Sequence, residues 1–306
     1  MTVLTNNPFA GIAHMLEHPF MRYAFLAGTA IAIASGLTGY FVVLRGQVFT
    51  GDALSHVAFT GALAALVAGL DLLLGLYAAC VIVALAMAAL GSRGRADDTV
   101  IGSVFAWVLG LGALFLTIYT TSSRGTDAAS GVNVLFGSIF GLSSSRAITD
   151  ALIALGVAAA VVAIGRPLFF ASIDEAVASA RGVPVRTLGF VFLGLVGITA
   201  AAATQAVGAL LLLGLLAAPA GAAQRFTARP FRALWLSSGI AVVSMWTGLM
   251  VAYADPSVPP SFGILAVATG SYLLAFLVTS TGVWSRMRPR SRRRDGRQIV
   301  VDTGPT

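Results

Sequence analysis

The 306-residue chain is 58% hydrophobic and only 10% charged, with a mean hydropathy of +0.90. A soluble globular protein carries about 25% charged residues, so this composition leaves too little polar surface to face water and excludes an ordinary soluble domain. The net charge is +7, and all 19 basic residues are arginine. A Walker-type phosphate-binding loop requires a lysine, so any ATPase that acts with this chain is another polypeptide.

Apolar stretches that approach the ~20 residues of a transmembrane helix recur along the whole chain. They predict an all-α, polytopic transmembrane helical bundle with about nine spans. Residues 1–20 are expected to be an extracytoplasmic N-terminal segment, and residues 21–283 the transmembrane domain. The expected spans are Met21–Leu44, Ala53–Leu70, Leu72–Leu90, Val100–Thr120, Ala147–Ile164, Thr187–Ala203, Ala206–Ala223, Ala233–Ala254 and Phe262–Gly282.

Between the fourth and fifth spans lies Ala129–Leu142, an apolar segment with three glycines that is too short to cross a bilayer. Irregular or broken helices at membrane depth are tolerated only where protein buries them or where they line a cavity. We therefore expect a re-entrant helix here.

Arginine placement predicts the orientation of the bundle. Most of the arginines in the connections fall on one side if nine spans alternate, and this side is expected to be cytoplasmic. The N-terminus is then outside and the C-terminus inside. Seven arginines lie between Arg286 and Arg297, so residues 284–306 are expected to form a disordered cytoplasmic tail. No aromatic residues interleave with these arginines to stack on bases, and we expect no nucleic-acid partner.

The 34 glycines and the repeated alanine runs are typical of helices that approach one another closely in lipid. The single cysteine, Cys80, excludes an intrachain disulfide and a cysteine-rich metal site. Composition alone therefore predicts a tight helical bundle in membrane lipid, without indicating its purpose.

Asp52 and His56 are the first candidate site. They are four residues apart and share one helix face, and Asp, His and the nearby Ser55 are ligand types that suit Zn²⁺ or Mn²⁺. The alternative is structural: Asp52 caps the helix after Gly51, and His56 is a satisfied polar residue of the bundle. Ionisable residues within a membrane are costly, which favours a function or a partner.

His14-Met-Leu-Glu-His18 matches the H-x-x-E-H pattern of inverted zinc proteases. Three interpretations stay open: an intramembrane metalloprotease, an external metal-collecting segment, and an amphipathic lead-in at the membrane surface. Pro19 follows immediately and no large aqueous domain is present, which favours the last.

Five short stretches together resemble one known family, the membrane permeases of bacterial zinc/manganese ABC importers, and the match runs from about Gly36 to Leu277. They occur in the order of that family: Gly51-Asp-Ala-Leu-Ser-His56, Asp98-Thr-Val-Ile-Gly102, Leu135-Phe-Gly137, Asp174-Glu-Ala-Val-Ala-Ser-Ala-Arg-Gly182, and the run from Gln205 to Leu213 that continues to Ala218-Pro-Ala220.

The resemblance implies a permease of the bacterial plasma membrane that is not itself an enzyme and has no permanently bound cofactor. Asp52 and His56 would contact the transported Zn²⁺ or Mn²⁺. The implied partners are an ATP-binding subunit, an extracytoplasmic metal-binding protein, and a second permease copy or a related permease. The ATPase would dock on a short cytoplasmic coupling helix that includes Asp174, Glu175, Ala178 and Gly182.

Local chemistry agrees with a helix at this point. Asp174 can cap it, Glu175 favours the positive end of its dipole, and Gly182 can end it. The alternative is an ordinary connecting helix.

A secondary transporter driven by an ion gradient is the alternative function. Such proteins commonly use paired intramembrane carboxylates, whereas Asp52 is the only acid that we place near the interior of a span. Asp/His sites accept zinc, manganese and iron, so the residues leave the metal open.

Overall fold

The protein is described here from a computed structural model, which covers residues 15, 17–91, 97–121, 137, 139–209 and 212–280. Within those ranges the chain forms helices and no strand, which confirms the predicted all-α class. In chain order the elements are α2 (Pro19–Leu44), α3 (Val48–Ala68), α4 (Leu72–Leu90), α5 (Asp98–Thr121), the 3₁₀ turn η2 (Ile139–Gly141), α7 (Ser144–Ile173), α8 (Glu175–Ala180), α9 (Val185–Val207), α10 (Leu212–Phe226), α11 (Pro230–Ala254) and α12 (Pro260–Ser280).

Eight of these helices are long and apolar enough to cross a membrane. The seventh expected span, Ala206–Ala223, corresponds to α10, which has only 15 residues. The expected span began at Ala206, but α9 continues to Val207 and the chain breaks at Gly208, which has a φ of +96°. Glycine adopts this backbone conformation without the steric cost that a Cβ would bring. The break therefore shortens the seventh apolar stretch from its N-terminal side.

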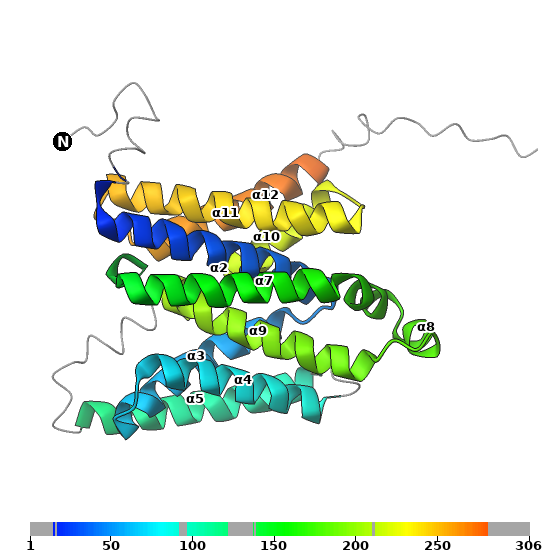
Figure 1. The fold of residues 1–306 in the computed structure, drawn as a ribbon, viewed down its shortest axis with the longest axis horizontal. Helices are drawn as coiled ribbons and strands as arrows, with labels where there is room; N and C mark the ends of the chain where they lie inside the picture. Colours follow the sequence, from blue (N-terminus) through cyan, green and yellow to red (C-terminus); the bar gives the residue numbers. More distant parts are fainter. Residues whose placement is uncertain are drawn as a thin grey trace, which may run out of the picture.

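The helices run alongside one another, and α9 lies between α7 and the group formed by α3, α4 and α5 (Figure 1). On the other side, α2 packs against α7, α10 and α11. The most apolar window of α2 is 78% buried, compared with 17% for α5 and 22% for α12. Thus α2 forms the centre of the bundle, whereas α5 and α12 present apolar side chains outward.

Small residues make the close helix contacts, as the composition predicts. At Gly36 of α2 an added Cβ would lie 2.5 Å from the Cα of Ser238 on α11, and the neighbouring Ser237 hydroxyl donates a 2.7 Å hydrogen bond to the Gly36 carbonyl. Gly61 of α3 and Gly75 of α4 meet in the same way, because a Cβ on either would contact the carbonyl oxygen of the other. Close backbone approach of this kind is how helices associate in lipid.

Much of the expected re-entrant segment lies outside the described residues. In its described part, Gly137 has a φ of +74°, and Ile139–Gly141 form the single turn η2. A Cβ on Gly137 would lie 2.6 Å from Ala206 O and Gly208 N, so this point packs directly against the break that ends α9. The tail at residues 284–306 and most of the segment 1–20 are also outside the described residues, and the domain boundaries stay predictions.

Candidate functional site

Asp52 and His56 lie one turn apart on α3, as predicted, and both are half-buried. Their neighbours Ala53, Leu54 and Ser55 are buried. The Ser55 hydroxyl donates a 2.6 Å hydrogen bond to the Asp52 carbonyl oxygen. This hydroxyl is therefore engaged by its own helix, and the outward-facing pair consists of the carboxylate and the imidazole alone.

Helix α5 covers one side of this pair. The ring of Phe105 packs edge-to-face against His56, with the ring centroids 5.2 Å apart. One turn further along α3, the Thr60 hydroxyl donates to Val108 O at 3.1 Å, and an added Cβ on Gly112 would lie 2.7 Å from the Thr60 hydroxyl oxygen. These contacts fix α3 against α5, and with it the position of the imidazole.

The pair does not form a complete metal centre by itself. Among the described residues, no group of three or more His, Cys, Asp or Glu side chains is close enough to hold a metal ion. Two ligands bind a divalent cation weakly, because Zn²⁺ prefers four ligands and Mn²⁺ prefers more oxygens. Such a pair suits an ion that must bind and then leave rather than a resident ion.

A second set of polar atoms lies next to the break after α9. The sequence motifs did not indicate a site at this position. Thr204 Oγ1 and Gln205 Oε1 are buried, and no hydrogen-bond partner is found for them within the described ranges. They lie in the last turn of α9, shortly before Gly208, and the backbone of the residues that follow them packs against Gly137. The signal was present in the sequence as a polar Thr-Gln pair followed by Ala-Val-Gly within an apolar run.

The predicted coupling helix is present as α8, at one end of the bundle (Figure 1). The Asp174 carboxylate accepts a 2.9 Å hydrogen bond from the Val177 amide and caps the helix. Ala178 is fully buried against Ala171 and Val185, and Gly182 has a φ of +81° just past the helix end. The caps are those expected from the sequence, and the buried alanine anchors the short helix to α7 and α9.

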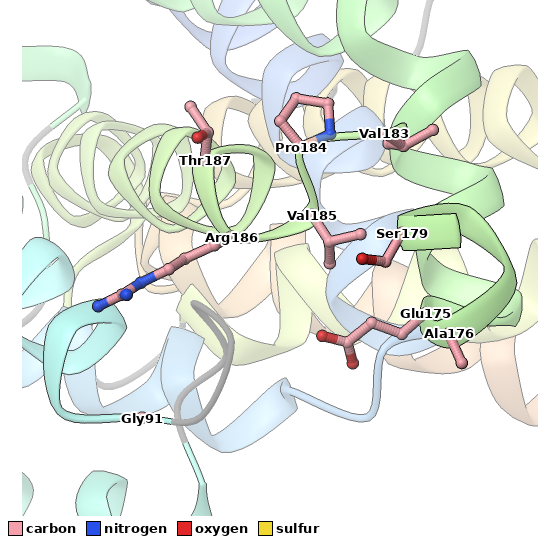
Figure 2. Close-up of a pocket in the computed structure, with 9 residues that line it drawn as sticks. All are labelled: Gly91, Glu175, Ala176, Ser179, Val183, Pro184, Val185, Arg186 and Thr187. Carbon is pink, nitrogen blue, oxygen red and sulfur yellow. The ribbon is translucent and has the colours of Figure 1, made fainter. Parts of the chain in front are cut away.

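A recess of about 670 Å³ lies beside α8 (Figure 2). One wall carries Glu175 and Ser179 of α8, and the other carries Arg186 of α9, near Gly91 at the end of α4. Glu175 Oε1 is buried and has no hydrogen-bond partner among the described residues. The recess therefore offers a carboxylate and a guanidinium on opposite walls, with no bond between them in the structure.

Asp150 corrects the interpretation that Asp52 is the only acid near a span interior. It lies in α7, is 1% exposed, and accepts a 3.2 Å hydrogen bond from the Tyr77 hydroxyl of α4. Asp150 lies only three residues inside the expected span that starts at Ala147. An acid at that position is typical of the end of a membrane span, so the sequence did not indicate that it is buried.

The His14-Met-Leu-Glu-His18 motif is only partly described by the structure. His14 lies outside the described residues. Glu17 and His18 precede α2, and the His18 ring stacks on Phe20, with a centroid distance of 5.6 Å.

Comparison with known proteins decides the family. The family model of the ABC 3 transport family matches residues 17–279. The chain belongs to the ABC 3 transport family. This confirms the resemblance found in the motifs, and it makes the chain a transport subunit rather than an enzyme, which excludes the metalloprotease interpretation.

Several relatives of this ABC 3 family member are similar over nearly their full length. The manganese transport system membrane protein MntC of Halalkalibacterium halodurans is 30% identical over 89% of this chain and 92% of its own. The manganese import system permease protein ScaB of Streptococcus parasanguinis is 26% identical over 85% of this chain and 90% of its own. The fold matches that of PsaBC from Streptococcus pneumoniae in complex with Fab, with a TM-score of 0.74 and 24% identity over 91% of this chain and 98% of that chain.

Proposed function

We propose that this chain is the membrane-spanning permease of an ATP-driven importer for a divalent transition metal in the bacterial plasma membrane. The observation that carries the proposal is the Asp52–His56 pair, half-exposed on α3 within a helix long and apolar enough to span the membrane. Manganese is the metal favoured by the names of the relatives, and zinc is the alternative. The metal is cargo, and no resident cofactor is proposed.

The side of the Asp52–His56 pair that α5 does not cover supports a second copy of the chain as a partner. An Asp at the centre of a membrane helix costs about 2.5–3.5 kcal/mol, and Asp52, which lies near the start of α3, would bear part of this cost if it faced lipid. On the same face, one turn earlier, Phe49 is 70% exposed. A homodimer that places α3 and α5 at its interface removes this face from lipid, and the two Asp–His pairs then supply the four ligands that a single chain lacks.

Helix α8 and its recess support a docking surface for the ATP-binding subunit. The helix projects from one end of the bundle, and its cap and buried Ala178 hold it rigidly to α7 and α9 (Figure 1). The recess beside it exposes Glu175 and Arg186, which can pair with charges of either sign on the ATPase (Figure 2). Movement of α8 is then transmitted directly along α7 and α9.

The arginine pattern supports a cytoplasmic position for α8. Arg181 and Arg186 flank it, and Arg225 and Arg229 lie at the connection between α10 and α11. By the positive-inside rule this pattern supports a cytoplasmic position for this end, with the N-terminus outside and the C-terminus inside. An extracytoplasmic metal-binding protein then delivers the ion to the opposite end.

The proposal is tested by elemental analysis of cells that express the permease with its ATPase under manganese limitation, and separately under zinc limitation. The wild type is expected to raise the content of one metal, and His56→Ala and Asp52→Asn to abolish the rise at equal membrane abundance. His18→Ala serves as a histidine control outside the spans and is expected to match the wild type. Unchanged metal content in wild-type cells, or wild-type behaviour of His56→Ala, contradicts the proposal.

A further inference from the structure

Asp150 is a carboxyl group in an unusual position. It is the seventh residue of α7, is 1% exposed, and lies one turn inside the exposed Arg146. Its Oδ1 accepts a 3.2 Å hydrogen bond from the Tyr77 hydroxyl of α4. Its Oδ2 is also buried and has no hydrogen-bond partner among the described residues. One oxygen of the carboxyl is therefore satisfied and the other is not.

The surroundings are apolar. A recess of about 580 Å³ lies beside Asp150, between α4 and α7 and over α9, and its lining includes Leu73, Val81, Ile153 and Ile198. In Figure 1, α9 separates α7 from α4, so the Tyr77–Asp150 bond reaches across from one helix group to the other. Burial of an ionised carboxylate among such groups costs several kcal/mol unless charge and hydrogen bonds compensate.

The compensating groups are few. On α7, Arg146 acts on Asp150 electrostatically, but its side chain is exposed and screened by solvent. On α4, the ionisable neighbours are Tyr77 and, one turn deeper, Cys80, whose thiol donates to Leu54 O at 3.4 Å. On α9, no ionisable residue follows Arg186.

On α2, which packs along α7, the ionisable residues of the first half are Arg22, which is exposed, and Tyr23. One neutral phenol and one screened arginine replace only part of the hydration that an ionised carboxylate loses.

We propose that Asp150 is a proton-binding site at the extracytoplasmic end of the groove between α4 and α7. In this conformation the carboxyl carries a proton on Oδ2, while Oδ1 accepts the hydrogen bond from Tyr77. The step is a simple protonation: a carboxylate oxygen takes up one H⁺ from external water, one O–H bond forms, and Tyr77 keeps its own proton. The position one turn below Arg146 gives external water access when the groove opens.

The ligand is a proton rather than a divalent metal ion. A hard divalent cation takes six or more oxygen ligands, whereas this recess offers one free carboxylate oxygen and a phenol that is already donating, between hydrocarbon walls. The sign of the pH dependence follows. Burial of Asp150 favours its protonated form, whereas the hydrogen bond from Tyr77 favours the ionised form, and burial is the larger effect. The arrangement that buries Asp150 is therefore stabilised as external pH falls and is lost as pH rises.

Infrared spectroscopy of the purified permease in lipid tests the site without any transport assay. The C=O stretch of a protonated carboxyl is distinct from the stretches of a carboxylate. At mildly acidic pH the wild type is expected to show this band. Asp150→Asn should lack it, and Asp255→Asn, which changes an exposed acid in the turn after α11, should keep it. Transfer into D₂O is expected to shift the band, since the site exchanges with water.

A second variant keeps the test decisive if Asp150→Asn does not fold. Tyr77→Phe retains the carboxyl and removes its donor, so the band is expected to remain and to shift in frequency. A wild-type spectrum without the band at mildly acidic pH overturns the proposal. Loss of the band on addition of Mn²⁺ or Zn²⁺ to the wild type also overturns it, because the carboxyl is then a metal ligand. Because no metal uptake enters this measurement, its failure is distinguishable from failure of the proposed transport function.

Discussion

The imidazole of His56 on α3 packs edge-to-face against the ring of Phe105 on α5, with the centroids 5.2 Å apart and the ring planes at 65°. This contact holds the imidazole on the same outward face as Asp52, which lies one turn earlier. Because α3 and α5 are also joined by the Thr60 hydrogen bond to Val108 O, the imidazole is oriented by its neighbours before any ion arrives. Orientation by packing makes Phe105 a positioning residue for the proposed metal pair.

Replacement of Phe105 by Ala is expected to weaken metal transport without abolishing it. An aromatic pair contributes about 0.5–1.5 kcal/mol beyond its buried area, and about 1.4 kcal/mol corresponds to a tenfold change in affinity. The apparent KM for the metal in a reconstituted uptake assay is therefore expected to rise up to about tenfold, with little change in kcat. Trp107→Ala, on the same helix with a side chain 71% exposed, is the matched control and should leave KM unchanged. An equal effect of both substitutions would contradict the positioning role.

Loss of the Asp174 cap is expected to weaken the stimulation of ATP hydrolysis by transported metal. An N-cap contributes about 0.5–2 kcal/mol, which is large for the six-residue helix α8. Asp174→Ala should reduce metal-stimulated ATPase activity of the assembled complex severalfold, whereas Asp174→Asn keeps a capping oxygen and should retain most of it.

A second cap in the same protein controls for general destabilisation. The Asp71 carboxylate caps α4 by accepting from the Leu73 and Leu74 amides at 2.8 and 3.3 Å. Asp71→Ala therefore removes a comparable bond at a distance from α8 and is expected to leave coupling intact. If Asp71→Ala and Asp174→Ala reduce the ATPase activity equally, α8 has no special role in docking.

Local signals in the sequence were sufficient for the spans and for α8. Hydropathy locates a membrane helix because lipid requires a continuous apolar stretch, and Asp174 and Gly182 mark the two ends of α8 because capping is a local interaction. The i, i+4 spacing likewise placed Asp52 and His56 on one face. Each of these features depends on residues close together in the chain.

Features that depend on tertiary contacts were not accessible in this way. The burial of Asp150 results from tertiary contacts of α7, and its bond to Tyr77 joins residues 73 positions apart. The break at Gly208 faces Gly137, which is distant in sequence. Helix α7 also extends to Ile173, beyond the end of the expected span at Ile164, because Pro167 is accommodated inside the helix.

Single-cysteine labelling is expected to confirm the proposed orientation. Cys80 is 0% exposed, so it should not react with a membrane-impermeant maleimide and leaves the wild type as a clean background. Ser257→Cys, in the exposed turn between α11 and α12, should be labelled from outside in intact cells. Ser179→Cys on α8 should be labelled only after the cells are opened. The reverse pattern would place α8 outside and remove the ATPase docking surface.

Gly137 is expected to tolerate no side chain, because backbone and packing both oppose one. Its φ of +74° is strained for any residue with a Cβ, and that Cβ would lie 2.6 Å from the carbonyl oxygen of Ala206. The strain costs about 1–3 kcal/mol, and the contact pushes directly on the break that ends α9. Gly137→Ala should therefore lower the Tm of the purified protein in detergent and reduce its abundance in the membrane. Gly156→Ala in α7, where an added Cβ meets nothing within 4 Å, should instead be neutral or stabilise by about 0.5–1 kcal/mol. If Gly137→Ala unfolds at the same temperature as the wild type, the close contact between Gly137 and Gly208 is not required for stability. Other residues then hold the break that ends α9.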